Sequence, residues 1–85
     1  MSSIIMNADT RRELSHMVKA NNKFYYVDST YTLDCGYETM AFDCDETGYI
    51  TDWCGVYTGR YLTKTDMVKG HDRICNNLEG YISNL

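Results

Sequence analysis

The sequence predicts an α+β fold, a three-stranded antiparallel β-meander flanked by an N-terminal and a C-terminal helix in the order α-β-β-β-α. Residues 23–57 are rich in β-branched and aromatic residues whose apolar positions alternate, as in strands. Residues 67–82 instead repeat apolar residues at helical spacing. With 85 residues and a hydrophobic fraction of 44%, we expect residues 1–85 to form a single packed domain.

The N-terminal segment is predicted to form the first helix. Asn7 or Asp9 can cap its start, and the helix is expected to run to about Ala20. Asn21–Asn22 suits its end, because asparagine tolerates the left-handed backbone conformation. The apolar positions that support this helix have helical spacing but are few: Leu14, Met17 and Val18.

The three strands are expected within residues 23–57. Lys23–Leu33 alternates apolar and polar residues and forms the first strand, followed by a turn at Asp34–Gly36. Tyr37–Tyr57 forms a hairpin around Asp45–Gly48, where aspartate at the first position and glycine at the fourth favour a type I turn with a bulge. The predicted register pairs Cys44 with Ile50, Phe42 with Asp52, and Met40 with Cys54.

This register divides the hairpin into two faces. We expect the C-terminal helix to cover the apolar face and the second face to be displayed unless another element covers it. The apolar face contains Met40, Phe42, Cys44, Ile50, Cys54 and Val56. The displayed face contains Tyr37, Thr39, Ala41, Asp43, Tyr49, Thr51, Trp53 and Tyr57.

The last helix is predicted to begin after Thr63, which with Asp66 resembles a capping box, and to end near Gly80. Gly70 is expected to weaken it slightly. Its core-facing residues are predicted to be Met67, His71, Ile74, Cys75, Leu78, Tyr81 and Ile82.

The net charge of −4 is unevenly distributed. Residues 24–62 hold seven acidic residues against Arg60 alone, a charge of −6, whereas residues 1–23 carry +2. The acidic middle should be repelled by nucleic acid and anionic membranes, so the favoured partner is a protein with a basic surface. Neither a signal peptide nor a membrane span is recognisable, which predicts a cytoplasmic protein.

The four cysteines are separated by 9, 10 and 21 residues, without the close pairs of a zinc knuckle. We expect them to be small buried hydrophobic residues, with a metal site, a disulfide or a reactive thiol as alternatives. They are Cys35, Cys44, Cys54 and Cys75.

No catalytic signature is found, so we expect neither an enzyme nor a cofactor. His71 is predicted to lie on the core face of the last helix, bonded to a backbone carbonyl, with a ligand or general base as the alternative. His16 is predicted to be a solvated helix residue. The acids around Asp45 do not follow the calcium-loop spacing, which favours a solvated turn.

Aromatic and acidic residues gather in the hairpin, and tyrosine and tryptophan are enriched at protein interfaces. The alternative is that the N-terminal helix or a second copy of the chain covers this face for stability. The predicted partner-binding residues are Tyr37, Asp43, Asp45, Glu46, Tyr49, Asp52, Trp53 and Tyr57.

Several stretches of residues 36–71 resemble small uncharacterised proteins of tailed bacteriophages and prophages: Gly36-Tyr37-Glu38-Thr39-Met40-x-Phe42, Gly48, Thr51-Asp52-Trp53, Tyr61 and Gly70-His71. The resemblance carries no catalytic residues and does not include the cysteines or the N-terminal third. It implies a phage setting and a location in the host cytoplasm, where small acidic phage proteins often inhibit host defence, as anti-CRISPR proteins do.

Together these observations predict a non-enzymatic phage-encoded inhibitor of a host defence or nucleic-acid-handling protein, which it contacts through the acidic, aromatic hairpin. The alternative is a small structural phage accessory protein that uses the tyrosine and tryptophan face as its own homodimer interface.

Overall fold

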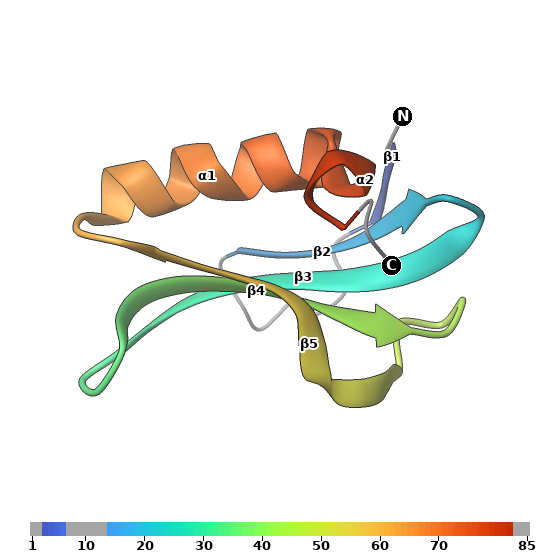
Figure 1. Cartoon of the computed structure of the whole chain (residues 1–85), viewed down its shortest axis with the longest axis horizontal. Coiled ribbons are helices and arrows are strands. Elements are labelled where there is room, and N and C mark those ends of the chain that lie inside the picture. Colours follow the sequence, from blue (N-terminus) through green and yellow to red (C-terminus); the bar gives the residue numbers. More distant parts are fainter. Residues whose placement is uncertain (1–2, 7–13, 83–85) are drawn as a thin grey trace.

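A computed structural model describes residues 3–6 and 14–82, and within them one antiparallel sheet carries two helices. The sheet is a meander in chain order, with α1 across one face (Figure 1). The elements are β1 (Ser3–Met6), β2 (Leu14–Ala20), β3 (Lys23–Thr32), β4 (Gly36–Cys44), β5 (Ile50–Tyr61), α1 (Lys64–Asn76) and α2 (Leu78–Tyr81). The α+β class is confirmed, but three strands are too few, because β2 to β5 form the meander and short β1 adds an edge. Neither described helix is long and apolar enough to cross a membrane.

The described part of the predicted first helix is strand β2. Its side chains alternate: Val18 and Ala20 belong to the core under α1, and Met17 points to the other face. A seven-residue stretch does not distinguish the helical period from the strand period, which explains the wrong prediction. Asn21 and Asn22 are left-handed as expected, with φ of 53° and 63°, but they form the two-residue turn of the β2–β3 hairpin. The predicted caps at Asn7 and Asp9 lie outside the described residues.

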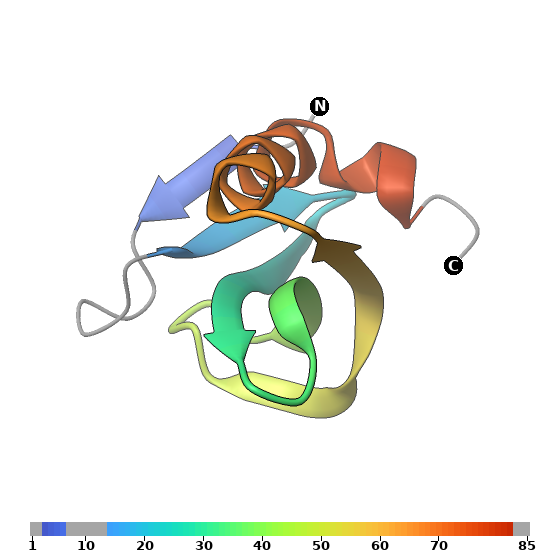
Figure 2. The same cartoon turned by 90° about the vertical axis from the view of Figure 1, so that its left-hand side faces the viewer.

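The β4–β5 hairpin keeps its predicted register only beside the turn. Cys44 pairs with Ile50 as expected, whereas Asp43 pairs with Asp52 and Ala41 with Tyr57. Two irregularities in the pairing therefore add residues to β5, which curves away from β4 and back toward α1 (Figure 2). The predicted pairs Phe42–Asp52 and Met40–Cys54 are wrong for this reason.

Gly55 lies within the curved part of β5. Its φ of +81° belongs to the left-handed region, which favours glycine. A Cβ atom built there would come within 3.2 Å of the Met40 Cε and 3.8 Å of the Phe42 ring. The curve therefore depends both on the free backbone of glycine and on its lack of a side chain.

The helix covers the opposite face of β4 from the one predicted. Thr39 and Ala41 are fully buried on the α1 side, while Met40 and Phe42 point away from it. Alternation defines two faces but does not indicate which one the helix covers, and small Thr39 and Ala41 let α1 approach closely. From the predicted apolar face, Val56 packs against the helix-side core.

The C-terminal helix begins as predicted, with the Thr63 hydroxyl accepting a hydrogen bond from the Asp66 N–H at 3.1 Å. It ends earlier than Gly80, because the Asn77 N–H bonds to the Arg73 and Ile74 carbonyls and the chain restarts as α2. Gly70 is buried where a Cβ atom would overlap the Tyr61 ring, so it provides a close contact.

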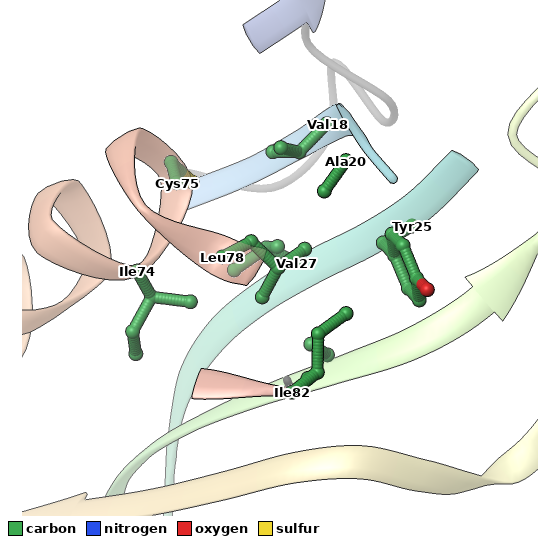
Figure 3. Close-up of a cluster of buried hydrophobic side chains, with 9 residues drawn as sticks. Val18, Ala20, Tyr25, Val27, Ile74, Cys75, Leu78 and Ile82 are labelled. Atoms are coloured by element: carbon green, nitrogen blue, oxygen red, sulfur yellow. The ribbon is translucent and has the colours of Figure 1, made fainter. Parts of the chain in front are cut away.

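The core lies between α1, α2 and the sheet (Figure 3). Of the predicted core-facing helix residues, Tyr81 is exposed and the rest are buried. The members of this cluster are Val18, Ala20, Tyr25, Val27, Ala41, Ile74, Cys75, Leu78 and Ile82.

Candidate functional site

Six of the eight predicted partner-binding residues gather at the β4–β5 turn, a region that we call the hairpin end. The turn itself is well formed: the Gly48 N–H bonds to the Asp45 carbonyl at 3.0 Å, and the Asp45 N–H bonds to the Tyr49 carbonyl at 2.9 Å. The hairpin end contains Asp43, Asp45, Glu46, Tyr49, Asp52 and Trp53.

Asp45 maintains the shape of this turn. Its Oδ1 accepts hydrogen bonds from the Thr47 hydroxyl at 2.6 Å, the Thr47 N–H at 2.9 Å and the Tyr49 N–H at 3.0 Å. These donors, the Thr47 hydroxyl first, hold the pKa of Asp45 below its usual value. Glu46 contributes none of these bonds, so its exposed charge can change without opening the turn.

Asp43 and Asp52 face each other in the register and line a surface pocket of about 490 Å³ together with Lys23 and Tyr25. The Asp52 carboxylate accepts a hydrogen bond from the Cys54 N–H at 2.9 Å, which lowers the pKa of Asp52. Burial, and then the charge of Asp43, raise the pKa of the Tyr25 hydroxyl. Two carboxylates against one lysine leave the pocket lining with a net negative charge.

Trp53 and Tyr49 are displayed, each with 72% of its surface exposed. The Trp53 ring lies on the other side of the sheet from the pocket, tilted against Phe42 with ring centroids 5.4 Å apart. An exposed tryptophan resting on a second aromatic ring is an anchor of the kind that interfaces use.

The other two predicted residues lie elsewhere. Tyr37 lies near the start of β4, at the opposite end of the strand, where its ring packs 4.8 Å from that of Tyr31. Tyr57 is half-buried against the core, with its ring edge-on to Tyr81 at 5.1 Å. The structure therefore separates both from the hairpin end.

A second cluster of polar side chains could not be predicted from the sequence, because its residues come from three strands and α1. His71 is fully buried, and its Nδ1 lies 2.6 Å from Ser29 Oγ, which in turn lies 2.5 Å from Thr39 Oγ1. The His71 Nε2 lies 2.8 Å from the Nδ1 of His16. His71 thus bonds to side chains and not to a backbone carbonyl, and His16 is a half-buried strand residue, contrary to both predictions.

Burial, and then the neighbouring His16, lower the pKa of His71 to about 4, so this ring is neutral at physiological pH. The Ser29–His71 distance resembles that of a nucleophile and its base. However, Ser29 is only 6% exposed and His71 is not exposed at all, so a substrate has no access to the pair. This closed geometry favours a structural or ligand-holding role.

The cysteines only partly match the prediction that they are buried. Cys75 is fully buried, Cys44 is half-buried, and Cys35 and Cys54 are exposed; all four are free thiols. Burial is the main cause that raises the pKa of Cys75 to about 12 and of Cys44 to about 11. Cys75 lies close to the histidine pair, as described below.

Neither a protein-family model, nor a curated protein, nor a solved structure matches this chain.

Proposed function

We propose that this chain is a non-enzymatic binding protein whose hairpin end docks on the basic surface of another protein. The observation that carries the proposal is the pocket lined by Asp43 and Asp52, together with the exposed Trp53 on the other side of the sheet at the same hairpin end. In its finer form, the proposal is that the chain is encoded by a phage and inhibits a host defence or nucleic-acid-handling protein.

A basic side chain of the partner fits this pocket chemically. The two carboxylates outnumber Lys23 in the pocket lining, so a guanidinium or ammonium group of the partner would be attracted to it. Arginine is the better candidate, because its planar group can donate to both carboxylates. Lys23 at the pocket edge would be displaced toward solvent.

The aromatic residues supply the apolar part of the contact. Trp53 and Tyr49 both follow the acidic turn in sequence and are both largely exposed. Burying such rings contributes binding energy, while the surrounding acids orient the partner and raise its rate of encounter. An acidic turn with aromatic anchors would compete with nucleic acid for a basic groove.

Capture from a bacterial lysate at low salt tests the proposal. Tagged wild-type protein is expected to retain a basic protein, identified by mass spectrometry and confirmed with the purified partner. Glu46→Lys should weaken this binding by about tenfold, since it reverses an exposed charge of the hairpin end. Asp34→Lys is the matched control, because it makes the same charge change in the exposed β3–β4 turn at the opposite end of β4.

A second matched pair of variants tests how the aromatic residues contribute to binding. Trp53→Ala should abolish capture, whereas Tyr31→Ala removes an exposed ring from the far end of the sheet and should leave it intact. Equal binding by all four variants would contradict the proposal. A stable dimer that Trp53→Ala converts to monomers would instead assign this surface to self-association.

A further inference from the structure

The polar cluster under α1 contains three side chains that ligate metals. The nitrogen atoms of His16 and His71 and the Sγ of Cys75 all lie within 4.8 Å of one another. His71 and Cys75 are four residues apart and share the buried side of α1, while His16 reaches them from β2. Helix and strand thus bring together three donors that are far apart in the chain.

From this arrangement we infer that His16, His71 and Cys75 form a site for one zinc-class transition-metal ion. Imidazole and thiolate are the ligands that zinc prefers, and three of them leave a fourth tetrahedral position for water. The inference is independent of the proposed docking surface.

The distances suit such an ion after small side-chain shifts. Tetrahedral zinc, with bonds of about 2.0–2.1 Å to nitrogen and 2.3 Å to sulfur, separates its ligand atoms by roughly 3.3–3.6 Å. The two histidine nitrogens are slightly closer than this, at 2.8 Å, and all three donors lie within 4.8 Å. Rotations that move each donor by about an ångström would therefore create the site.

The hydrogen bonds behind His71 point in the same direction. Metal-bound histidines usually donate their second N–H to an oxygen, which orients the ring. His71 has such an oxygen, Ser29 Oγ at 2.6 Å from its Nδ1, and Ser29 is itself held by Thr39. With the Nδ1 proton directed at Ser29, the Nε2 lone pair of His71 faces His16 and is available to a metal.

Metal binding changes the protonation of His16 and Cys75. In the metal-free chain, the Nδ1–H of His16 can donate to the Nε2 of His71. When the ion binds, His16 loses the proton on Nδ1 to solvent and takes one up on Nε2, so both rings remain neutral. Cys75 loses its thiol proton to solvent and becomes a thiolate, because a bound cation offsets the cost of that charge. One proton is therefore released for each ion bound.

Cobalt titration of the whole chain, first stripped of metal with a chelator, tests this site. We expect one cobalt ion per chain, the visible bands of tetrahedral cobalt and a near-ultraviolet thiolate-to-cobalt band, all removed by added zinc. Cys75→Ala should abolish the near-ultraviolet band, and His16→Gln should weaken cobalt binding by about tenfold or more. Cys54→Ala, which removes an exposed thiol, should leave the titration unchanged.

Two results would overturn the inference: a wild-type chain that shows no cobalt bands at millimolar metal, or a thiolate band that survives Cys75→Ala. If Cys75→Ala fails to fold, the half-buried His16→Gln decides instead. An undiminished cobalt affinity in that variant would exclude the site.

Discussion

Polar residues on the helix-covered side of the sheet are buried, whereas polar residues at the hairpin end lie at the surface. Beneath α1, Ser29, Thr39 and His71 are buried and bonded to one another. At the hairpin end, Asp43 and Asp52 line an open pocket with one lysine, and Trp53 projects into solvent. The buried polar groups must find partners within the chain, whereas the carboxylates at the hairpin end can be solvated by water.

This difference separates stability from binding. Changes under α1 should be costly to folding, because each buried polar atom depends on the next. Changes at the hairpin end should leave the fold nearly intact and act on recognition. Substitutions in the two regions can test whether stability and binding depend on different residues.

Removing His71 should have the largest effect. His71→Ala would create a cavity and leave Ser29 and His16 without their shared partner, at a cost of about 3–4 kcal/mol in the free energy of unfolding. Urea unfolding of the metal-free chain measures this cost. A loss below about 1 kcal/mol would mean that the cluster does not stabilise the fold.

Lowering the pH should reduce the free energy of unfolding through the protonation of His71. His71 has a pKa of about 4 in the folded chain against an ordinary 6.5, so the unfolded chain takes up the proton first as the pH falls. Stability is complete above pH 6.5 and should decrease by roughly 3 kcal/mol between pH 6.5 and 4. Urea unfolding at several pH values follows this loss. His71→Gln should flatten the curve in that window, and an unchanged slope would assign the loss to other groups.

The curve of β5 should depend on Gly55. Gly55→Ala meets both an unfavourable φ and the Met40 side chain, for an expected cost of about 2 kcal/mol. Gly36→Ala is the control, since its φ of +71° is similar but nothing lies within 4 Å of the new Cβ, and about 1 kcal/mol is expected. Equal thermal shifts in the two variants would show that packing against Met40 is unimportant.

Trp53→Ala should have the smallest effect on stability. Its ring is 72% exposed and its described ring contact is with Phe42, so a loss of about 0.5 kcal/mol is expected in the same urea assay. A loss comparable to that of His71→Ala would make Trp53 part of the core and remove the distinction between the two regions.

Local signals predicted the parts of the fold that local contacts determine. The Thr63 cap, the Asp45–Gly48 turn and the register beside it depend on neighbours in the chain, and the structure confirms them. Strand alternation placed Tyr49 and Trp53 on one face but left open whether that face is displayed or covered; both residues are exposed.

Long-range contacts determine what the sequence could not predict. Strand β2 is too short for its period to be decisive, and the covered face of β4 depends on where α1 packs. The curve in β5 follows from two irregularities in its pairing with β4. The pairing of His16 with His71 joins residues 55 positions apart, which no spacing rule would connect.

The most direct test of the central claim, that the hairpin end accepts basic side chains, is a titration of the isotope-labelled chain with a tetra-arginine peptide followed by NMR. We expect saturable chemical-shift changes concentrated at Asp43, Asp52 and the Trp53 indole, and these changes should weaken as salt is raised. Residues of α1 such as Ile74 should not move. Chemical-shift changes centred on α1, or none at low salt, would contradict the claim that the hairpin end accepts basic side chains.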